Sequence, residues 1–221
     1  MYMAKTSNWH DDYWLLLMQI YLRKPVGAKP VFSRAMVELG LELHISPQVL
    51  AAKMQDIGKL DTPRVEHIWN TYSGNPRKLT RAVQLLREMK GFGKANEFYE
   101  GVELNETWER DWKPLPEDQR LTPVMLILVL DLYFKLTPAT MVKETPEVQE
   151  LARLTRISAN DVVELLDVFL HCDPYLNRRD ITLNPLLPAC QAIWQRFGNG
   201  APQDLATLAE QLKEYYRNDK P

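Results

Sequence analysis

The sequence ELARLTRISANDVVEL, Glu150 to Leu165, contains the pattern that decides the fold. Its apolar residues recur at helical spacing, which distinguishes it from an alternating strand. Ser158 with Asp161 three residues later is a variant of the capping box, which begins a helix. The pattern therefore predicts two helices joined by a very short turn.

The same pattern occurs earlier in the chain. A shift of 112 residues lays Leu15–Asp61 over Ile127–Asp173 without a gap, and most aligned positions keep their apolar or polar character. After an insertion around Tyr175–Leu187, Ile68-Trp69 aligns with Ile193-Trp194. Such self-similarity indicates a duplicated structural unit. The identical pairs of the ungapped part are Leu16/Leu128, Tyr21/Tyr133, Glu38/Glu150, Leu39/Leu151, Ile45/Ile157, Ser46/Ser158 and Asp61/Asp173.

The fold class that follows is all-α, with two tandem copies of one multi-helix module. Copy one is expected to span residues 1–114 and copy two residues 115–221, with the proline- and acid-rich stretch 113–119 as the linker. Each copy is predicted to have a core of three helices followed by two more. No segment shows sustained alternation, so we expect few strands or none.

Local signals place the helices. In copy one the apolar stripe from Trp14 to Leu22 predicts the first helix, and later helices are expected from Ser33, from Ser46, over 63–72 and over 78–89. In copy two they are expected after Thr122-Pro123, from Thr145, from Ser158, over 186–197 and over 203–216. The hydroxyls of Ser33 and Thr145 are predicted to cap the first free amides.

Composition places the chain among ordinary globular proteins, with 45% hydrophobic and 25% charged residues. The longest apolar run, Val124–Leu130, is far shorter than the ~20 residues of a membrane helix. We expect no signal peptide and no membrane association. Cys172 and Cys190 are too few for a disulfide framework, so a reducing cytoplasm is the expected compartment.

Charge is unevenly distributed. The formal net charge of -2 gives no global attraction to nucleic acid. Residues 64–94 hold seven basic side chains against two acidic ones, a local charge of +5, whereas residues 95–119 hold eight acids against Arg110 and Lys113. These two stretches either form solvated faces that neutralise each other or mark a basic binding surface.

The predicted helix pair resembles the helix-turn-helix of DNA-binding domains, over about twenty residues in each copy. In copy two Ala152 is the small residue that allows close helix crossing, and Ile157, Val162 and Leu165 fall where that motif buries apolar residues. Copy one has Lys53 at the position of Leu165. The chain also loosely resembles uncharacterised bacterial proteins with two such helical modules, and that resemblance implies no activity. Arg156 and His44 replace the glycine common in the turn of the motif.

If the resemblance implies DNA reading, the third helix of copy one suits it, because its side chains are amides and lysines. The third helix of copy two carries acids that repel phosphate, so we expect copy two to bind a protein partner or a second copy of the chain. A basic helix in copy one adds candidate phosphate contacts. The predicted nucleic-acid-binding residues are Gln48, Lys53, Gln55, Lys59, Arg77, Lys78, Arg81 and Arg87.

Other motifs favour structural roles. Gly91-Phe92-Gly93-Lys94 lacks the Walker spacing and follows a predicted helix, so a helix end is expected there. His171-Cys172-Asp173 and His10-Asp11-Asp12 lack the geometry of a metal site. His44 and His67, expected on helices, have no nucleophile nearby, and Trp69 and Trp194 are expected in the core, with base or peptide stacking as the alternative. We expect no catalytic centre, metal or cofactor.

Three functions remain open. The first is a non-enzymatic DNA-binding or regulatory protein whose partner is duplex DNA. The second is a helical scaffold for protein interaction without nucleic-acid binding, which an exposed apolar groove would favour. The third is an enzyme, which requires a polar pocket with convergent titratable groups.

Overall fold

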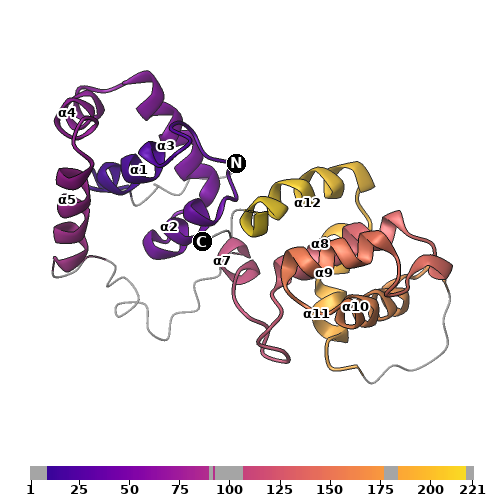
Figure 1. Cartoon of the computed structure of the whole chain (residues 1–221). Helices are drawn as coiled ribbons and strands as arrows, with labels where there is room; N and C mark the ends of the chain where they lie inside the picture. Colours follow the sequence, from indigo (N-terminus) through magenta and orange to yellow (C-terminus); the bar gives the residue numbers. More distant parts are fainter. Residues whose placement is uncertain (1–8, 90–91, 93–106, 177–183, 218–221) are drawn as a thin grey trace, which may run out of the picture. The chain divides into compact units, whose positions relative to one another are not determined.

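The computed structural model describes residues 9–89, 92, 107–176 and 184–217 (Figure 1). Regular structure within these ranges is entirely helical, without a strand, as the sequence predicted. The chain divides into two compact units, Met1–Glu106 (unit 1) and Thr107–Pro221 (unit 2).

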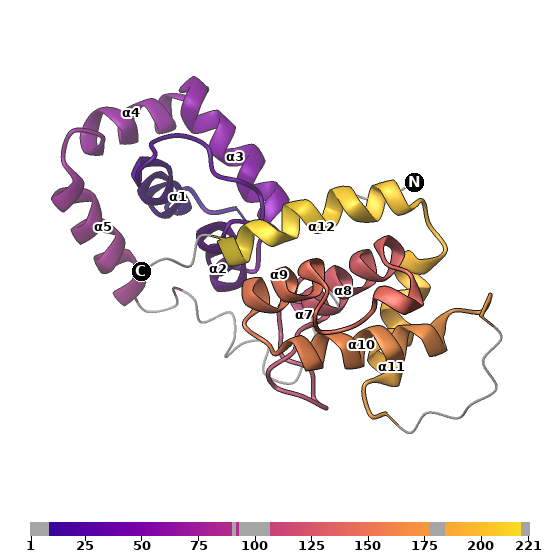
Figure 2. The ribbon, with the colours of Figure 1, turned by 45° about the vertical axis from the view of Figure 1, so that its right-hand side comes forward.

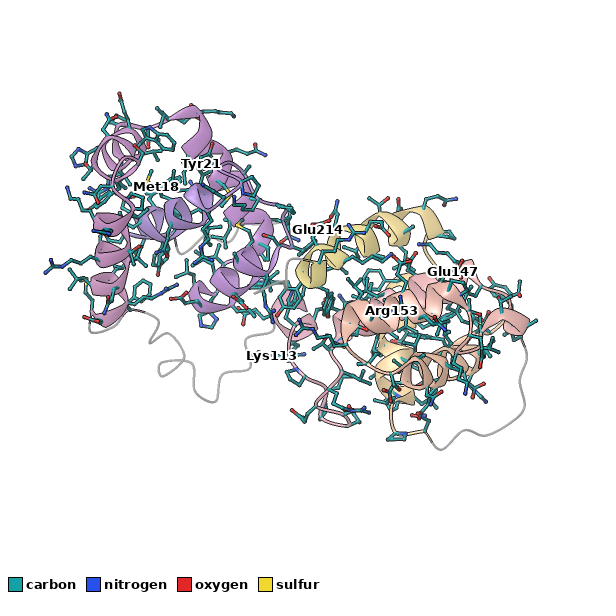
Figure 3. The ribbon with its side chains drawn as sticks, viewed as in Figure 1. Met18, Tyr21, Lys113, Glu147, Arg153 and Glu214 are labelled. Atoms are coloured by element: carbon teal, nitrogen blue, oxygen red, sulfur yellow. The ribbon has the colours of Figure 1, made fainter. Side chains whose placement is uncertain are left out.

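Unit 1 is built around its first helix. Helix α1 packs against each of the other four helices of the unit, and it buries Trp14, Leu17 and Met18 among them. Met18 and Tyr21 project from α1 between the neighbouring helices (Figure 3). The helices are α1 (Tyr13–Leu22), α2 (Arg34–Leu43), α3 (Pro47–Lys59), α4 (Pro63–Tyr72) and α5 (Pro76–Glu88).

Local chemistry explains where these helices start. Helices α3, α4 and α5 each have proline in the first turn, where a missing amide hydrogen costs nothing. The Thr62 hydroxyl accepts from the amide of Val65 at 3.2 Å, and the Asn75 side chain accepts from the amide of Lys78 at 3.0 Å. The prediction for residues 63–72 is confirmed, and α5 begins two residues before the predicted 78.

Unit 2 surrounds a more apolar helix. Every residue of α8 from Val124 to Tyr133 is buried, because α9, α10, α11 and α12 all pack against it. The predicted start at Thr122-Pro123 is confirmed, since the Thr122 hydroxyl accepts from the amide of Met125 at 3.4 Å. The elements are α7 (Thr107–Asp111), α8 (Pro123–Lys135), η1 (Pro138–Thr140), α9 (Pro146–Thr155), α10 (Ala159–Cys172), α11 (Leu187–Ile193), η2 (Trp194–Gly198) and α12 (Pro202–Arg217).

Neither α8 nor any other helix in the described part of the chain has the length and apolar content that crossing a membrane demands.

The stretch 113–119, predicted to be a linker, lies within unit 2. Leu115 is buried, its amide donates to the carbonyl of Leu121 at 2.8 Å, and the Gln119 side chain donates to the carbonyl of Leu115 at 2.9 Å. The two units divide between Glu106 and Thr107, so the predicted boundary at residue 114 falls after α7. The stretch is a hydrogen-bonded turn leading into α8.

Two of the predicted helix caps are wrong. Ser33 and Thr145 precede α2 and α9, but neither hydroxyl accepts from the helix. The Thr145 hydroxyl donates instead to the carbonyl of Thr140 at 2.5 Å. The first turn of α2 is closed by the carbonyl of Ser33, which accepts from the amides of Met36 and Val37.

The capping box of α10 is present. The Ser158 hydroxyl accepts from the amide of Asp161 at 3.0 Å, and the Asp161 carboxylate accepts from the amide of Ser158 at 2.9 Å. Ser46, the residue before α3, makes no such bond through its side chain.

We therefore expect Ser158→Ala to lower the free energy of unfolding by about 1 kcal/mol. The matched control Ser46→Ala should change it by less than half as much in urea unfolding followed by circular dichroism.

The loss of unfolding free energy caused by Ser158→Ala should depend on pH. The hydrogen bond from the Ser158 hydroxyl, aided by its amide and by Arg120, holds the pKa of Asp161 below the ordinary range. A lowered folded-state pKa stabilises the fold above the unfolded pKa, near 4, and this contribution is lost as the pH falls through the lower folded value. The change in unfolding free energy caused by Ser158→Ala should therefore become smaller below about pH 4. An effect constant from pH 7 to 2.5 would contradict the role assigned to the carboxylate.

Candidate nucleic-acid interface

A three-residue connection joins α2 to α3 in unit 1. Helix α2 ends at Leu43, His44 takes a left-handed conformation with φ 55°, Ile45 is buried, and Ser46 precedes α3. Left-handed backbone is uncommon for a residue other than glycine, and it turns the chain sharply here. The expectation that His44 lies on a helix is thus corrected, because it ends α2.

Helix α3 divides into an inner and an outer face. Leu50, Met54 and Ile57 are almost fully buried in the core of unit 1. The outer face presents exposed residues at intervals of four, three and four, which is one stripe along a helix. The stripe consists of Gln48, Ala52, Gln55 and Lys59.

The side chain of Lys53 contacts two tryptophan rings and a carboxylate within unit 1, which the sequence did not indicate. Its Nζ lies 5.4 Å from the ring centroid of Trp14 and 5.5 Å from that of Trp9, and 3.8 Å from the carboxylate of Asp56. A cation over an aromatic face is attracted by the negative ring face. Trp9 also packs edge-on against Trp14, with centroids 4.8 Å apart. Lys53 is therefore better explained as a residue that holds α3 against the start of α1 than as the predicted DNA contact.

Helix α5 carries the second predicted group. Arg77, Lys78 and Arg81 are exposed, and Lys78 lies 5.3 Å above the ring of Tyr72. Arg87 makes two hydrogen bonds of 2.7 Å to the two carboxylate oxygens of Glu42 on α2. This bidentate pair joins helices that are distant in the sequence and gives Arg87 a structural role.

The two groups lie on separate parts of unit 1. Both views place α1 between α3 and α5 (Figure 1, Figure 2). Packed helices lie about 8–10 Å apart, so the axes of α3 and α5 are up to about 20 Å apart. The major groove of B-DNA is about 12 Å wide. Two helices separated by a third do not both enter one groove, and the outer stripe of α3 faces away from α1 and therefore away from α5.

The corresponding face of unit 2 has a different chemistry. Helix α9 ends at Thr155, Arg156 is left-handed with φ 61°, and α10 exposes Asn160, Glu164 and Asp167. Leu165, at the position of Lys53, is buried. The α10 face is therefore acidic, as the sequence indicated.

Two other segments of unit 2 pair with the acids of α10. The Arg120 guanidinium lies 3.4 Å from the carboxylate of Asp161, and the Asn184 side chain donates to Glu164 at 2.8 Å. Arg120 belongs to the turn that leads into α8, and Asn184 precedes α11. These contacts engage part of the α10 face within the unit.

A small cavity in unit 2 bears on the enzymatic alternative. It has a volume of about 120 Å³ and lies between α8, α9 and α12. The buried carboxylate of Asp131 accepts from Lys135 at 2.6 Å, and Lys213 bonds Glu210. Glu147, labelled on α9 in Figure 3, lines the same cavity. Its lining contains carboxylates, lysines and leucines, without a serine, cysteine or histidine among the described residues.

The remaining candidates for chemistry have structural partners. The Tyr133 hydroxyl donates to Asp173 at 2.6 Å, and His171 Nδ1 lies 2.9 Å from the carbonyl of Asp167. Burial raises the pKa of Cys172 to about 11 and that of Cys190 to about 12, so neither thiol is ionised at neutral pH. No group of three or more metal-ligating side chains occurs in the described ranges.

The remaining sequence motifs are only partly described. Gly91, Gly93 and Lys94 lie outside the described residues. In the His10-Asp11-Asp12 trio, Asp12 lies 3.7 Å from the guanidinium of Arg64.

Comparison of the chain with family models, curated proteins and solved structures found no match.

The role assigned to Lys53 predicts a stability effect. Lys53→Ala should lower the free energy of unfolding by about 0.5–1 kcal/mol, because it removes the cation from both tryptophan faces. It should also shift tryptophan fluorescence. The matched control is Lys59→Ala, an exposed lysine on the same helix, for which we expect a change within about 0.5 kcal/mol. Equal effects of the two substitutions in urea unfolding would contradict the stabilising contact of Lys53 with the two tryptophan rings.

Proposed function

We propose that the chain is a non-enzymatic DNA-binding protein of the regulatory kind, which places α3 of unit 1 in the major groove of duplex DNA. The observation that carries this proposal is the outer stripe of α3. It is exposed, it contains two glutamines and a lysine, and it follows a tight turn that sets α3 against α2. Helix-turn-helix proteins present their reading helix in this way.

The contact set we propose is smaller than the one predicted from the sequence. Lys53 contacts two tryptophan rings and Asp56, and Arg87 makes two hydrogen bonds to Glu42, so both are assigned to the fold. We also propose phosphate contacts for the exposed basic residues of α5, which α1 separates from the groove-facing helix. The proposed set is Gln48, Gln55, Lys59, Arg77, Lys78 and Arg81.

We further propose that the two units are copies of one helix-turn-helix module. Helices α2 and α9 both have ten residues and lie at the 112-residue offset, and each is followed by a left-handed residue. The aligned aromatic residues also make the same contact. Tyr21 meets Trp69 edge-on at 6.0 Å and 78°, and Tyr133 meets Trp194 at 5.6 Å and 76°.

A protein-interaction scaffold is the second candidate, and one observation favours it. Leu85 and Met89, one turn apart at the end of α5, are 55% and 59% exposed. Adjacent exposed apolar side chains are typical of protein contacts. These two residues lie near the proposed phosphate contacts of α5. Phosphate contacts weaken as salt rises and apolar contacts do not, so the salt dependence of binding distinguishes the two functions.

Salt dependence tests the DNA proposal. The full chain should bind mixed-sequence duplex DNA, and the double variant Lys78→Ala/Arg81→Ala should bind more weakly. Its log-log slope against salt should be shallower by about 1.8, because each lost phosphate contact removes ~0.9. Fluorescence anisotropy from 50 to 200 mM salt measures both slopes.

The control for this experiment is Lys143→Ala/Arg153→Ala, which removes two exposed basic residues from unit 2. Its slope should match that of the unchanged chain. The absence of binding at 50 mM salt would rule out the DNA proposal and leave the scaffold. Equal slopes for both double variants would remove α5 from the interface.

A further inference from the structure

We infer that α3 reads a short A·T-containing sequence, with Gln48 and Gln55 each bonding an adenine and Ala52 contacting a thymine methyl group. This inference rests on the proposed DNA binding and adds which base pairs are recognised. It concerns the outer stripe of α3 in unit 1 only.

The chemistry of the stripe carries the first step. A glutamine amide has one donor and one acceptor side, which match N6 and N7 of adenine in the major groove. Gln48 and Gln55 are exposed, and neither amide has a hydrogen-bond partner within the described part of the chain. An alanine methyl at the right place contacts the C5-methyl group of thymine. Ala52 is exposed between the two glutamines.

The spacing of the stripe sets the spacing of the bases. Gln55 follows Gln48 by seven positions, which is about 10.5 Å along a helix. Base pairs are stacked about 3.4 Å apart along each strand. A helix lying along the groove therefore places the two amides about three base steps apart, with Ala52 over a base pair between them.

The acidic outer face of α10 indicates that unit 2 does not read a second site of this kind. At the positions of Ala52 and Gln55, α10 has Glu164 and Asp167, both exposed. A carboxylate is an acceptor only, so it cannot bond adenine N7 and it is repelled by phosphate. We therefore expect each chain to recognise one such site, through unit 1 alone.

Selection from a random duplex library tests the reading. The unchanged full chain should enrich a sequence with two A·T pairs about three steps apart. Gln48→Ala should lose the preference at one of them and Gln55→Ala at the other, each with a loss of about 5- to 150-fold on the enriched duplex. Gln211→Ala, an exposed glutamine on α12, is the matched control and should retain the full preference. Circular dichroism confirms that all variants are folded.

A second arm tests Ala52 without changing the protein. Deoxyuridine in place of the intervening thymine removes one methyl group from the enriched duplex, and affinity should fall severalfold. Binding that is equally strong for all library members would overturn the inference while leaving DNA binding intact. Enrichment of a G·C-only site would also overturn it. If no DNA is bound at any salt, the proposed function and this inference fall together.

Discussion

The burial of one central helix in each unit is the constraint on which the rest of the structure depends. Helix α8 is buried around its whole circumference from Val124 to Tyr133, and α1 buries most of its apolar side chains. Full burial of one leucine-sized side chain contributes about 1.5–3 kcal/mol, so such a helix is stable only when neighbours cover all its sides. In each unit four other helices do this, and their outer faces are left for charged and amide side chains.

The turn between α2 and α3 follows from the same constraint. Both helices must contact α1, and only three residues connect them, so the chain must reverse quickly. His44 achieves this in a left-handed conformation, and Ile45 is buried directly after it. The turn thereby fixes which residues of α3 face inward. Its outer stripe is a consequence of packing, before any function is assigned to it.

Features that depend on local sequence were predicted well. The helices over 63–72 and after Thr122-Pro123 follow from proline in the first turn and from a capping threonine, and these signals act within four residues. The inner and outer faces of α3 follow from helical periodicity. The wrong cap at Thr145 shows the limit of local signals, because its hydroxyl donates to the carbonyl of Thr140 and accepts from no amide of α9.

Features that depend on tertiary contacts were not predicted. Nothing near Arg87 in the sequence indicates that Glu42 lies within hydrogen-bonding distance, and nothing near Lys53 indicates two tryptophan faces. The sequence predicts both residues as DNA contacts from their charge and their place on a helix, and neither signal reports these partners. A basic residue on a predicted helix is a weak indicator of binding, because the fold uses the same charges for its own cohesion.

The contrast between α3 and α10 shows how two similar helix pairs acquire different surfaces. In α10 the outer positions are acidic, and Arg120 and Asn184 from flanking segments pair with two of its side chains. In α3 the corresponding stripe is uncharged except for Lys59. A net charge of -2 summed over the chain averages these two faces and hides both. Because electrostatic attraction between exposed charges is screened beyond about 10 Å at 0.1 M salt, a partner responds to the face that it approaches. The proposed DNA binding therefore depends on the exposed residues of unit 1.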